Sequence, residues 1–548
     1  MTHLRRLWMS SLLLIVLLAS SVSAALAADN AYDTNYVTSI TYMNVGTDAA
    51  NLSVTFYNAT GGTTTDYPLL NSNGSAVTIP VKASSSIAVS AVSGLSATWK
   101  GGAVISSNQP LIATMVQVSN DSVIKVRPVS NGFQSTDGSG TIIVPTVMKA
   151  CFNDKLTTRF NVQNVGGSSN TASISIKWPN GDAATTIPIT TPSLAPGAVY
   201  AVDMGAVSTI EPTNPYTKPS GCLFNGSAVI TSAGSMVASA LETSTINKYA
   251  NSFEGFKGTT ADGATIIYMP SAMCTVNYGD GDQSSAYAIQ NLAATATTVS
   301  IAFTSQVRTN GALVGSPATN TVTLEIAANS KASVPGCDSL KNSVGNKNTA
   351  TGTGMPASSV GSAVITSTGG NIVAISKVIG AGLTTATPGI MSGGGGTTVN
   401  VPFVRYSDKC YVPTVSNTIC QGASRQRTLF AVQNIGTSAA TVTMTLYNQK
   451  GESVATYLSP SIPAGGKVSL SPVSTSTQTL TLTSATNATA FSEFGYWCPA
   501  ITDAQASCTV AYAGSASFTS SSAIAVITRV LTMSPLGPSG DDYNGIPE

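Results

Sequence analysis

The chain has 548 residues, with 25 Lys and Arg, 24 Asp and Glu and a single His, and only 9% of its residues are charged. An ordinary soluble domain carries about 25% charged residues, so Ser, Thr, Asn, Gln and Gly must build most of this surface. A net charge near zero argues against electrostatic binding of nucleic acid. The one histidine, His3, lies in a segment that we expect to be removed, which excludes His-based catalysis and His-ligated zinc.

The first 27 residues have the pattern of a signal peptide. Arg5 and Arg6 form a basic start, residues 7–18 supply an apolar run, and residues 25–27 offer small side chains for cleavage. The apolar run is shorter than the roughly 20 residues that cross a bilayer. We therefore expect cleavage, export to the extracellular space or cell surface, and no transmembrane segment in the mature chain.

Two short sequence phrases recur four times along the remaining chain. The first is Gly-Ser-Ala-Val-Ile-Thr-Ser or a variant of it, at residues 102–107, 226–232, 361–367 and 514–520, and a second apolar stretch follows it each time after a tight turn. The other phrase lies upstream and centres on Asn44, Asn164, Asn291 and Asn434. The intervals between these asparagines suit one β-sandwich domain each, so the sequence predicts four diverged copies of one unit.

Hydrophobic residues alternate with polar ones between the two phrases. Leu52, Val54 and Phe56 alternate with Ser53 and Thr55, and the other three copies show the same pattern. A period of two places one face of a strand in a core and the other in solvent. No window after the signal peptide shows sustained helical periodicity, so we expect an all-β mature chain.

An apolar strand into Asn-x-Gly, an alternating strand into a hairpin, and a later Gly turn together resemble immunoglobulin-like modules of bacterial surface proteins, the CARDB-type adhesion-related module above all. The resemblance covers the first half of each unit and rests on the four asparagines and the turns at Gly197 and Gly465. Unit three departs from it at Ala293, where the module has Gly. The resemblance implies tandem immunoglobulin-like β-sandwiches in an adhesive or surface protein.

Composition sets the expected domain boundaries. Segments rich in Gly, Ser and Thr at 130–140, 251–263 and 380–398 predict flexible linkers, with 393–396 the most flexible. The units should then behave as beads on a string. The expected organisation is a signal peptide at 1–27, sandwiches at 28–134, 141–250, 265–380 and 398–535, and a tail at 536–548.

All eight cysteines lie in the exported part, which favours disulfides. Their distribution predicts Cys151–Cys222 in the second unit and Cys274–Cys337 in the third. The last unit has Cys410, Cys420, Cys498 and Cys508, which allow three pairings. Cys410–Cys420 with Cys498–Cys508 is preferred, because each pair brackets a short loop.

The sequence offers little for catalysis. Carboxylates such as Glu211, Glu242, Glu254, Glu325, Glu452 and Glu493 occupy unrelated positions in different units, so no acid–base pair stands out and we expect no enzyme and no required cofactor. Two oxygen-rich clusters suit calcium, Asp280 with Asp282, and Asp541 with Asp542 and Asn544. The alternatives are a turn for the first cluster and a solvated tail for the second.

Aromatic residues suggest a second binding hypothesis. Trp99, Trp178 and Trp497, with Tyr496, would form a sugar-stacking platform if they were exposed. Their positions fit alternating core faces at least as well, and the core interpretation is favoured.

The first unit differs from the others at its beginning. Units two to four each start with an apolar strand, at 142–144, 266–268 and 399–401, whereas the corresponding place ahead of Asn44 falls within the signal peptide. Unit one would then lack its first strand and expose a sheet edge that another chain could fill. The alternative is that residues 32–37 serve as a shorter edge strand.

These observations predict a non-catalytic surface or extracellular protein that acts by spacing, adhesion or self-assembly. Its expected partners are copies of itself or cell-surface components. A carbohydrate-binding accessory protein is the alternative, and a carboxylate-dependent hydrolase is the third hypothesis.

Overall fold

The computed structural model describes residues 30–548 except for 60–63, 69–77, 97, 120–125, 180–185, 209–220, 278–280, 310–311, 343–348, 381–382, 408–409, 412–424, 474, 476, 484–506, 509–510 and 535–536. The described residues form strands and two single-turn 3-10 helices, η1 (Val89–Ala91) and η3 (Asp338–Leu340), which confirms the all-β prediction. The signal-peptide prediction at 1–27 lies outside them. No helix among the described residues is long and apolar enough to cross a membrane.

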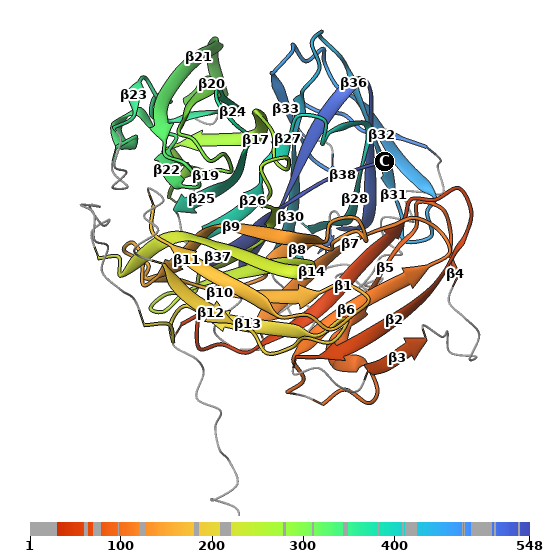
Figure 1. Ribbon diagram of the computed structural model, residues 1–548. Coiled ribbons are helices and arrows are strands. Elements are labelled where there is room, and N and C mark those ends of the chain that lie inside the picture. The colour runs from red at the N-terminus through yellow and green to blue at the C-terminus, as the bar shows by residue number, and fades with distance from the viewer. Residues whose placement is uncertain are drawn as a thin grey trace, which may run out of the picture.

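The strands fall into four consecutive units (Figure 1). Unit 1 contains β1 (Tyr36–Asn44), β2 (Ala50–Asn58), β3 (Thr64–Pro68), β4 (Thr78–Ile79), β5 (Ser84–Ala88), β6 (Gly101–Ser107), β7 (Leu111–Ser119) and β8 (Val129–Asn131). Unit 2 contains β9 (Ser139–Lys149), β10 (Leu156–Asn164), β11 (Ala172–Lys177), β12 (Ile187–Thr190), β13 (Val199–Asp203), β14 (Phe224–Ser244), β15 (Ala250–Glu254) and β16 (Phe256–Lys257).

Units 3 and 4 contain more and shorter additional strands. Unit 3 contains β17 (Ile266–Cys274), β18 (Val276–Asn277), β19 (Asp282–Asn291), β20 (Thr297–Thr309), β21 (Ala312–Ile326), β22 (Lys331–Pro335), β23 (Thr351–Gly352), β24 (Ser359–Ser367), β25 (Ile372–Gly380), β26 (Leu383–Pro388) and β27 (Ile390–Met391). Unit 4 contains β28 (Gly396–Ser407), β29 (Cys410–Tyr411), β30 (Arg425–Asn434), β31 (Val442–Tyr447), β32 (Ser453–Leu458), β33 (Lys467–Leu470), β34 (Thr481–Leu482), β35 (Ser507–Cys508), β36 (Ala511–Ser534), β37 (Gly537–Asn544) and β38 (Ile546–Pro547).

Each unit has two β layers, and unit 2 shows the pattern most simply. One layer runs β12-β11-β14-β9-β16, and the other runs β13-β10-β14-β15. Strand β14 belongs to both layers, because its first half carries the Gly-Ser-Ala-Val-Ile-Thr-Ser phrase and pairs with β11 and β9, whereas its second half pairs with β10 and β15. The two apolar stretches therefore form no hairpin, since the chain crosses here from one layer to the other.

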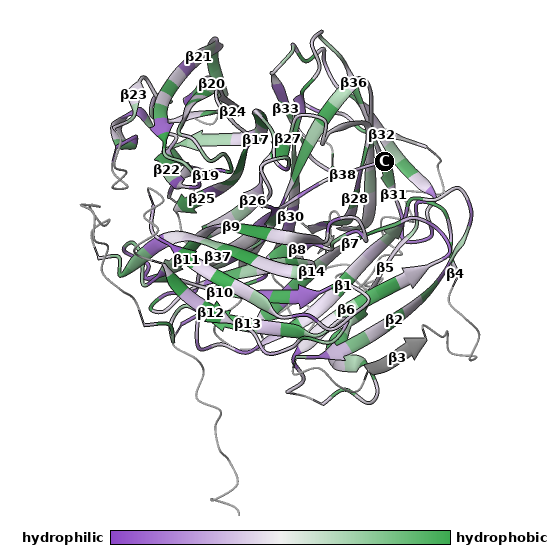
Figure 2. Cartoon of the chain, in the orientation of Figure 1, coloured by the Kyte–Doolittle hydropathy of each residue, from purple (hydrophilic) through white to green (hydrophobic). Residues whose placement is uncertain are grey.

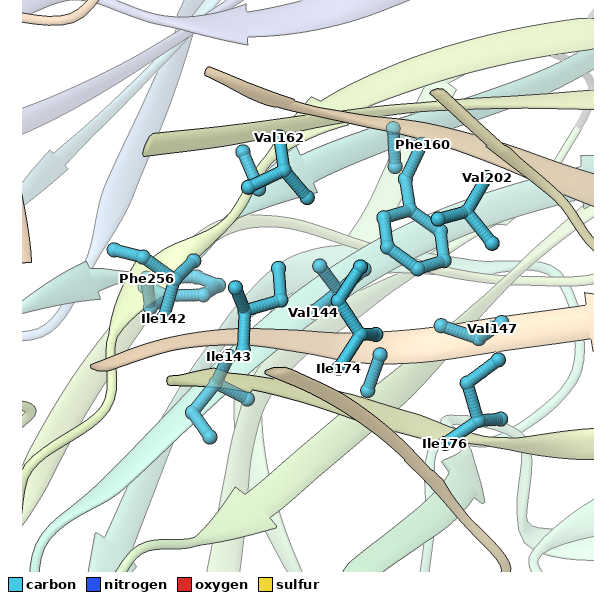
Figure 3. Packing of buried hydrophobic residues seen from close by; sticks show 14 of the residues in the cluster. Ile142, Ile143, Val144, Val147, Phe160, Val162, Ile174, Ile176, Val202 and Phe256 are labelled. Carbon is cyan, nitrogen blue, oxygen red and sulfur yellow. The ribbon is translucent and has the colours of Figure 1, made fainter. Parts of the chain in front are cut away.

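Alternating apolar side chains from both layers meet in each unit's core. In unit 2, Ile142 and Val144 of β9 pack in one cluster with Ile174 of β11 and Val162 of β10 (Figure 3). Figure 2 shows short hydrophobic blocks along β9, β10 and β11, which are otherwise of mixed polarity. The charge-poor strands thus build cores by the period-two pattern that the sequence predicts.

The repeated asparagine has the same structural role in every unit. Asn164 is fully buried, its Nδ2 donates to the carbonyls of Ser168 and Leu194, and its Oδ1 accepts from the Gly166 N–H. Asn44, Asn291 and Asn434 make the corresponding bonds. In unit 3 the N–H of Ala293 takes the place of the glycine N–H, so this departure from the motif leaves the bond intact.

The units form a closed ring, and the expectation of beads on a string is wrong. Successive units contact each other, and unit 4 closes onto unit 1 through the bond from Ser515 Oγ to the Lys82 carbonyl (3.0 Å) and the ion pair between Lys82 and Glu548 (2.6 Å). The other junctions include Arg159 Nη1 to the Tyr32 carbonyl, Lys331 Nζ to the Gly226 carbonyl, and Ser362 Oγ to the Gly465 carbonyl.

Two of the three expected linkers and the expected tail contain strands of this ring. Residues 251–263 include most of β15 and all of β16, and residues 380–398 include β26 and β27. Residues 536–548 include β37, which pairs with β36, and β38, which pairs with β28. Asn251, Thr387 and Asp541 of these segments are buried, whereas Gly393 and Gly394 are exposed and residues 132–138 form no strand.

The disulfide pairs predicted for units 2 and 3 are present. The Sγ atoms of Cys151 and Cys222 are bonded, and so are those of Cys274 and Cys337. Each bridge closes a loop, of 71 and 63 residues respectively. Replacing both cysteines of the first bridge with alanine is expected to cost about 4 kcal/mol of unfolding free energy, because a closed loop restricts the unfolded chain. Denaturant titration of this variant against wild type measures the loss, and equal midpoints would contradict the expectation.

In unit 4 the backbone register favours a different pairing from the one preferred on sequence. Cys410 of β29 lies opposite Cys508 of β35. Cys508 precedes β36 much as Cys222 precedes β14, so the topology matches the bridge of unit 2. Peptide mapping under non-reducing conditions is expected to recover Cys410 linked to Cys508. A Cys410–Cys420 peptide would instead support the sequence-based preference; Cys420 and Cys498 lie outside the described residues.

Candidate functional site

One edge strand of each unit lies at the centre of the ring. These strands are β8, β15, β26 and β37, and β15 contacts β8 and β26 while β37 contacts β26 and β8. Each is a short strand at the edge of its own layer, so its second edge faces the corresponding strands of other units. The centre of the ring therefore contains polar backbone that needs partners.

Asp541 of β37 supplies those partners for the other three units. Its side chain is fully buried. Oδ2 accepts from the N–H of Val129 in unit 1 (2.9 Å) and of Ser252 in unit 2 (2.7 Å). Oδ1 accepts from the N–H of Ala386 in unit 3 (3.0 Å) and from the N–H of Asp542 (2.9 Å). One carboxylate thus joins all four units.

Burial raises the pKa of Asp541 well above its ordinary value, and the neighbouring Asp542 acts in the same direction. The N–H groups of Ala386, Val129 and Ser252 act in the opposite direction, because they donate to the anion. These contacts leave an aspartate surrounded by donors.

Asp542 binds a buried arginine beside it. Arg529 Nε donates to Oδ1 (2.7 Å) and Nη2 donates to Oδ2 (2.6 Å), which is a bidentate pair. Thr385 Oγ1 of unit 3 also donates to Oδ2 (2.9 Å). The pair therefore holds β37 against β36 and β26 together.

Asn544 completes the central contacts of β37. Its Nδ2 donates to the Pro388 carbonyl (2.9 Å) and its Oδ1 accepts from Thr387 Oγ1 (3.0 Å). Its own carbonyl accepts from Asn131 Nδ2 of unit 1 (3.0 Å). Asp541, Asp542 and Asn544, which form the second of the two predicted calcium clusters, all lie in β37.

Their oxygens, however, face N–H, O–H and guanidinium donors. A calcium site needs six or more oxygens directed at one point. The described residues contain no cluster of three or more acidic, histidine or cysteine side chains that could hold a metal. For the other calcium prediction, Asp282 Oδ1 accepts from Asn277 Nδ2 (3.3 Å), and Asp280 lies outside the described residues.

Glu254 of β15 accepts the backbone N–H of Asn131 in β8. Burial raises the pKa of Glu254 to about 7, although the Asn131 N–H acts in the opposite direction. At pH values between 4.5, the ordinary pKa of a glutamate, and about 7, Glu254 keeps its proton in the folded protein but has lost it in the unfolded chain. The contribution of Glu254 to stability therefore falls as pH rises through this window and is constant above it.

The variant Glu254→Gln is expected to remove this pH dependence. At pH 8 it should be more stable than wild type by up to about 3 kcal/mol, and at pH 4.5 the two should agree within about 1 kcal/mol. Urea titrations at both pH values measure the difference. An unchanged gap between variant and wild type across this range would show that Glu254 does not hold the extra proton.

A second buried charge pair joins units 2 and 3. Lys377 Nζ of β25 donates to both carboxylate oxygens of Glu242 in β14 (2.6 and 2.7 Å) and to Thr146 Oγ1 (3.1 Å). Burial lowers the pKa of Lys377, and the Glu242 carboxylate raises it. Nearby, Lys331 Nζ donates to Asn225 Oδ1, and burial lowers the pKa of Lys331 to about 7.

No protein-family model and no curated protein matches this chain. The function must therefore be argued from the geometry. The central cluster bonds backbone amides and paired side chains of neighbouring units, so its chemistry is that of a structural joint.

Trp99 and Trp178, the two described aromatic residues considered for sugar binding, do not share a surface. Trp178 is 1% exposed and packs against Phe224 in the core of unit 2. Trp99 is half-buried, lies edge-on to Phe56 and donates to Asn58 Oδ1 (2.8 Å). Tyr496 and Trp497 lie outside the described residues.

Sequence reasoning missed the structural role of these residues. It singled out Asp541 and Asp542 as calcium ligands in a tail, and it treated Glu242 and Glu254 as scattered carboxylates. One signal was available, since Arg529 follows the fourth repeat phrase within an apolar stretch, where a lone charge needs a buried partner.

Proposed function

We propose that this protein is an exported, non-catalytic structural or adhesive protein of the cell surface or extracellular space. In this proposal its four units are related to the immunoglobulin-like adhesion modules that the asparagine phrases resemble. The closed ring would act as one rigid block that presents the outer faces of its units.

One observation carries the proposal. The carboxylates buried between the units, Asp541, Asp542, Glu242 and Glu254, each accept hydrogen bonds from a neighbouring unit. An acid–base catalyst needs a carboxyl directed at a substrate position. Here the buried charges connect units, so the ionisable groups that could do chemistry support a structural role.

The two intact disulfide pairs favour an oxidising location. The low charge of the chain suits a surface that depends little on ion pairs, and so tolerates changes of salt.

Fractionation of cells that express the full chain tests the proposal. The protein is expected in the medium or on the outer surface, with an N-terminus near residue 28 by mass spectrometry. A protein that keeps residues 1–27 and stays in the cytoplasm would overturn it. Turnover of a glycan that a single Asp or Glu substitution abolishes would favour the hydrolase hypothesis instead.

A further inference from the structure

We infer that the second edge of β6 in unit 1 binds an extended, uncharged strand from another polypeptide. This edge is called the open edge below. The inference deepens the proposed function, on which it rests, by naming the kind of partner that a structural or adhesive ring would take.

The pairing of β6 differs from that of its counterparts. Among the described residues, β6 pairs with β2 alone. The corresponding stretches of β14, β24 and β36 pair on one side with β11, β20 and β31, and on the other side with the first strand of their own unit, β9, β17 and β28. Within the described residues, unit 1 thus lacks the strand that completes this layer in the other units.

The core of unit 1 is less covered at this edge. Ala103 and Ile105 are only partly buried. The equivalent positions are fully buried in the other units: Ala228 and Ile230, Ala363 and Ile365, and Ala516 and Phe518. In unit 2 the strand β9 covers them, with Ile230 opposite Ile142 and Ala228 opposite Val144. An added strand would bury the same positions in unit 1.

The neighbouring unit is uncovered at the same place. Each first strand also contacts the next unit, β9 touching β19 and β25, β17 touching β30 and β36, and β28 touching β1 and β7. In units 3, 4 and 1, the first strand of the preceding unit covers the residue before the repeated asparagine. That residue is therefore buried: Gln290 is 1% exposed, and Gln433 and Met43 are 0% exposed. In unit 2, which follows the incomplete unit, Gln163 is only partly buried and Asn161 is exposed.

The described residues that precede β1 bond to unit 2 and do not pair with β6. The N–H of Ala31 donates to the Asn247 carbonyl and that of Tyr32 donates to the Ser244 carbonyl, both in unit 2. Tyr36 and Val37 belong to β1 and pair with β7. The alternative that residues 32–37 form an edge strand in the missing place is therefore wrong.

The three sister strands define the partner's chemistry. Each has a branched residue, one further residue, then Val or Met followed by Pro, as in Ile142-Ile-Val-Pro145, Ile267-Tyr-Met-Pro270 and Val399-Asn-Val-Pro402. A register irregularity follows this segment in all three. The β6 sequence carries no charge and no proline, the usual guards of an exposed edge. The fitting partner is thus an extended, uncharged segment with branched apolar residues at alternate positions.

A fluorescently labelled peptide with the sequence of residues 139–149 tests the inference against the purified full chain. Saturable binding in the micromolar range is expected by fluorescence anisotropy. The matched peptide carrying Ile142→Asp and Val144→Asp should bind at least tenfold more weakly, because both side chains would enter the core. No binding of the first peptide at millimolar concentration would overturn the inference.

Cysteine crosslinking locates the bound peptide. Thr141 lies opposite Thr231 in unit 2, and the equivalent of Thr231 in unit 1 is the exposed Ser106. A peptide with Thr141→Cys should form a disulfide with the Ser106→Cys variant. The control variant Ser53→Cys places its thiol on β2, opposite Ser106 but one strand farther from the edge, and should not react.

Two results would count against the inference. Equal crosslinking of both variants would show non-specific binding. A disulfide between two Ser106→Cys chains, in place of the peptide adduct, would show that the β6 edges of two copies pair with each other and take no added strand of this kind. Neither result bears on the proposed function, which the fractionation experiment tests. The inference and the proposed function can therefore fail separately.

Discussion

Replacing Asp541 with asparagine is expected to lower the unfolding free energy by about 3 kcal/mol. The carboxylate now accepts hydrogen bonds from four N–H groups. The asparagine amide keeps one acceptor oxygen, but its NH2 group would face two of these four N–H groups. Leaving a buried donor without a partner costs about 1–3 kcal/mol for each group. Chemical denaturation of the full chain measures the loss.

Hydrogen exchange shows whether this loss comes from the proposed joint. The amides of Val129, Ser252 and Ala386 lie in three different units, and all should exchange faster in the Asp541→Asn variant. The exposed Asp48 provides the control, since Asp48→Asn removes a carboxylate from the surface of unit 1 and should change neither quantity. Unchanged protection at all three amides would refute the role of Asp541 as the common acceptor.

Breaking the Lys377–Glu242 pair from one side should be at least as damaging. The variant Glu242→Leu leaves a buried ammonium group without its carboxylate and is expected to lose about 3–5 kcal/mol. Lys377→Met should lose a similar amount. The double variant should recover most of the loss, because two apolar side chains of similar volume need no charge partner.

Denaturant titration of the four proteins completes a double-mutant cycle. The partly exposed pair between Lys341 and Asp338 is the control, because Lys341→Met should cost less than about 1 kcal/mol. Additive losses in the buried cycle would mean that the two charges contribute independently, against the geometry described above.

Local sequence patterns predicted the content of each unit well. Asn164 and its counterparts bond to backbone groups of turns only a few residues away. The motif is therefore recognisable in the sequence itself. The bridges Cys151–Cys222 and Cys274–Cys337 each join residues of one unit, and the pairing followed from the unit boundaries. The missing first strand of unit 1 was visible because the other copies show what should stand there.

The centre of the ring was not visible in this way. Asp541 bonds to Val129, Ser252 and Ala386, which are far from it along the chain and from each other. Nothing in the local pattern of Gly540-Asp-Asp-Tyr-Asn544 separates a buried strand from a solvated tail, because both tolerate polar residues.

The amino-acid sequence by itself determined an all-β chain of four related units, two of their internal bridges and the incomplete first unit. These features depend on short-range periodicity, turns and self-similarity, all of which can be read from neighbouring residues or from a comparison of the repeats. Only the tertiary structure decided that the units close into a ring, that polar residues between them are buried, and that scattered charges meet as partners. The reason is that a buried charge is stable only beside donors or counter-charges, and here the rest of the folded chain brings those groups together.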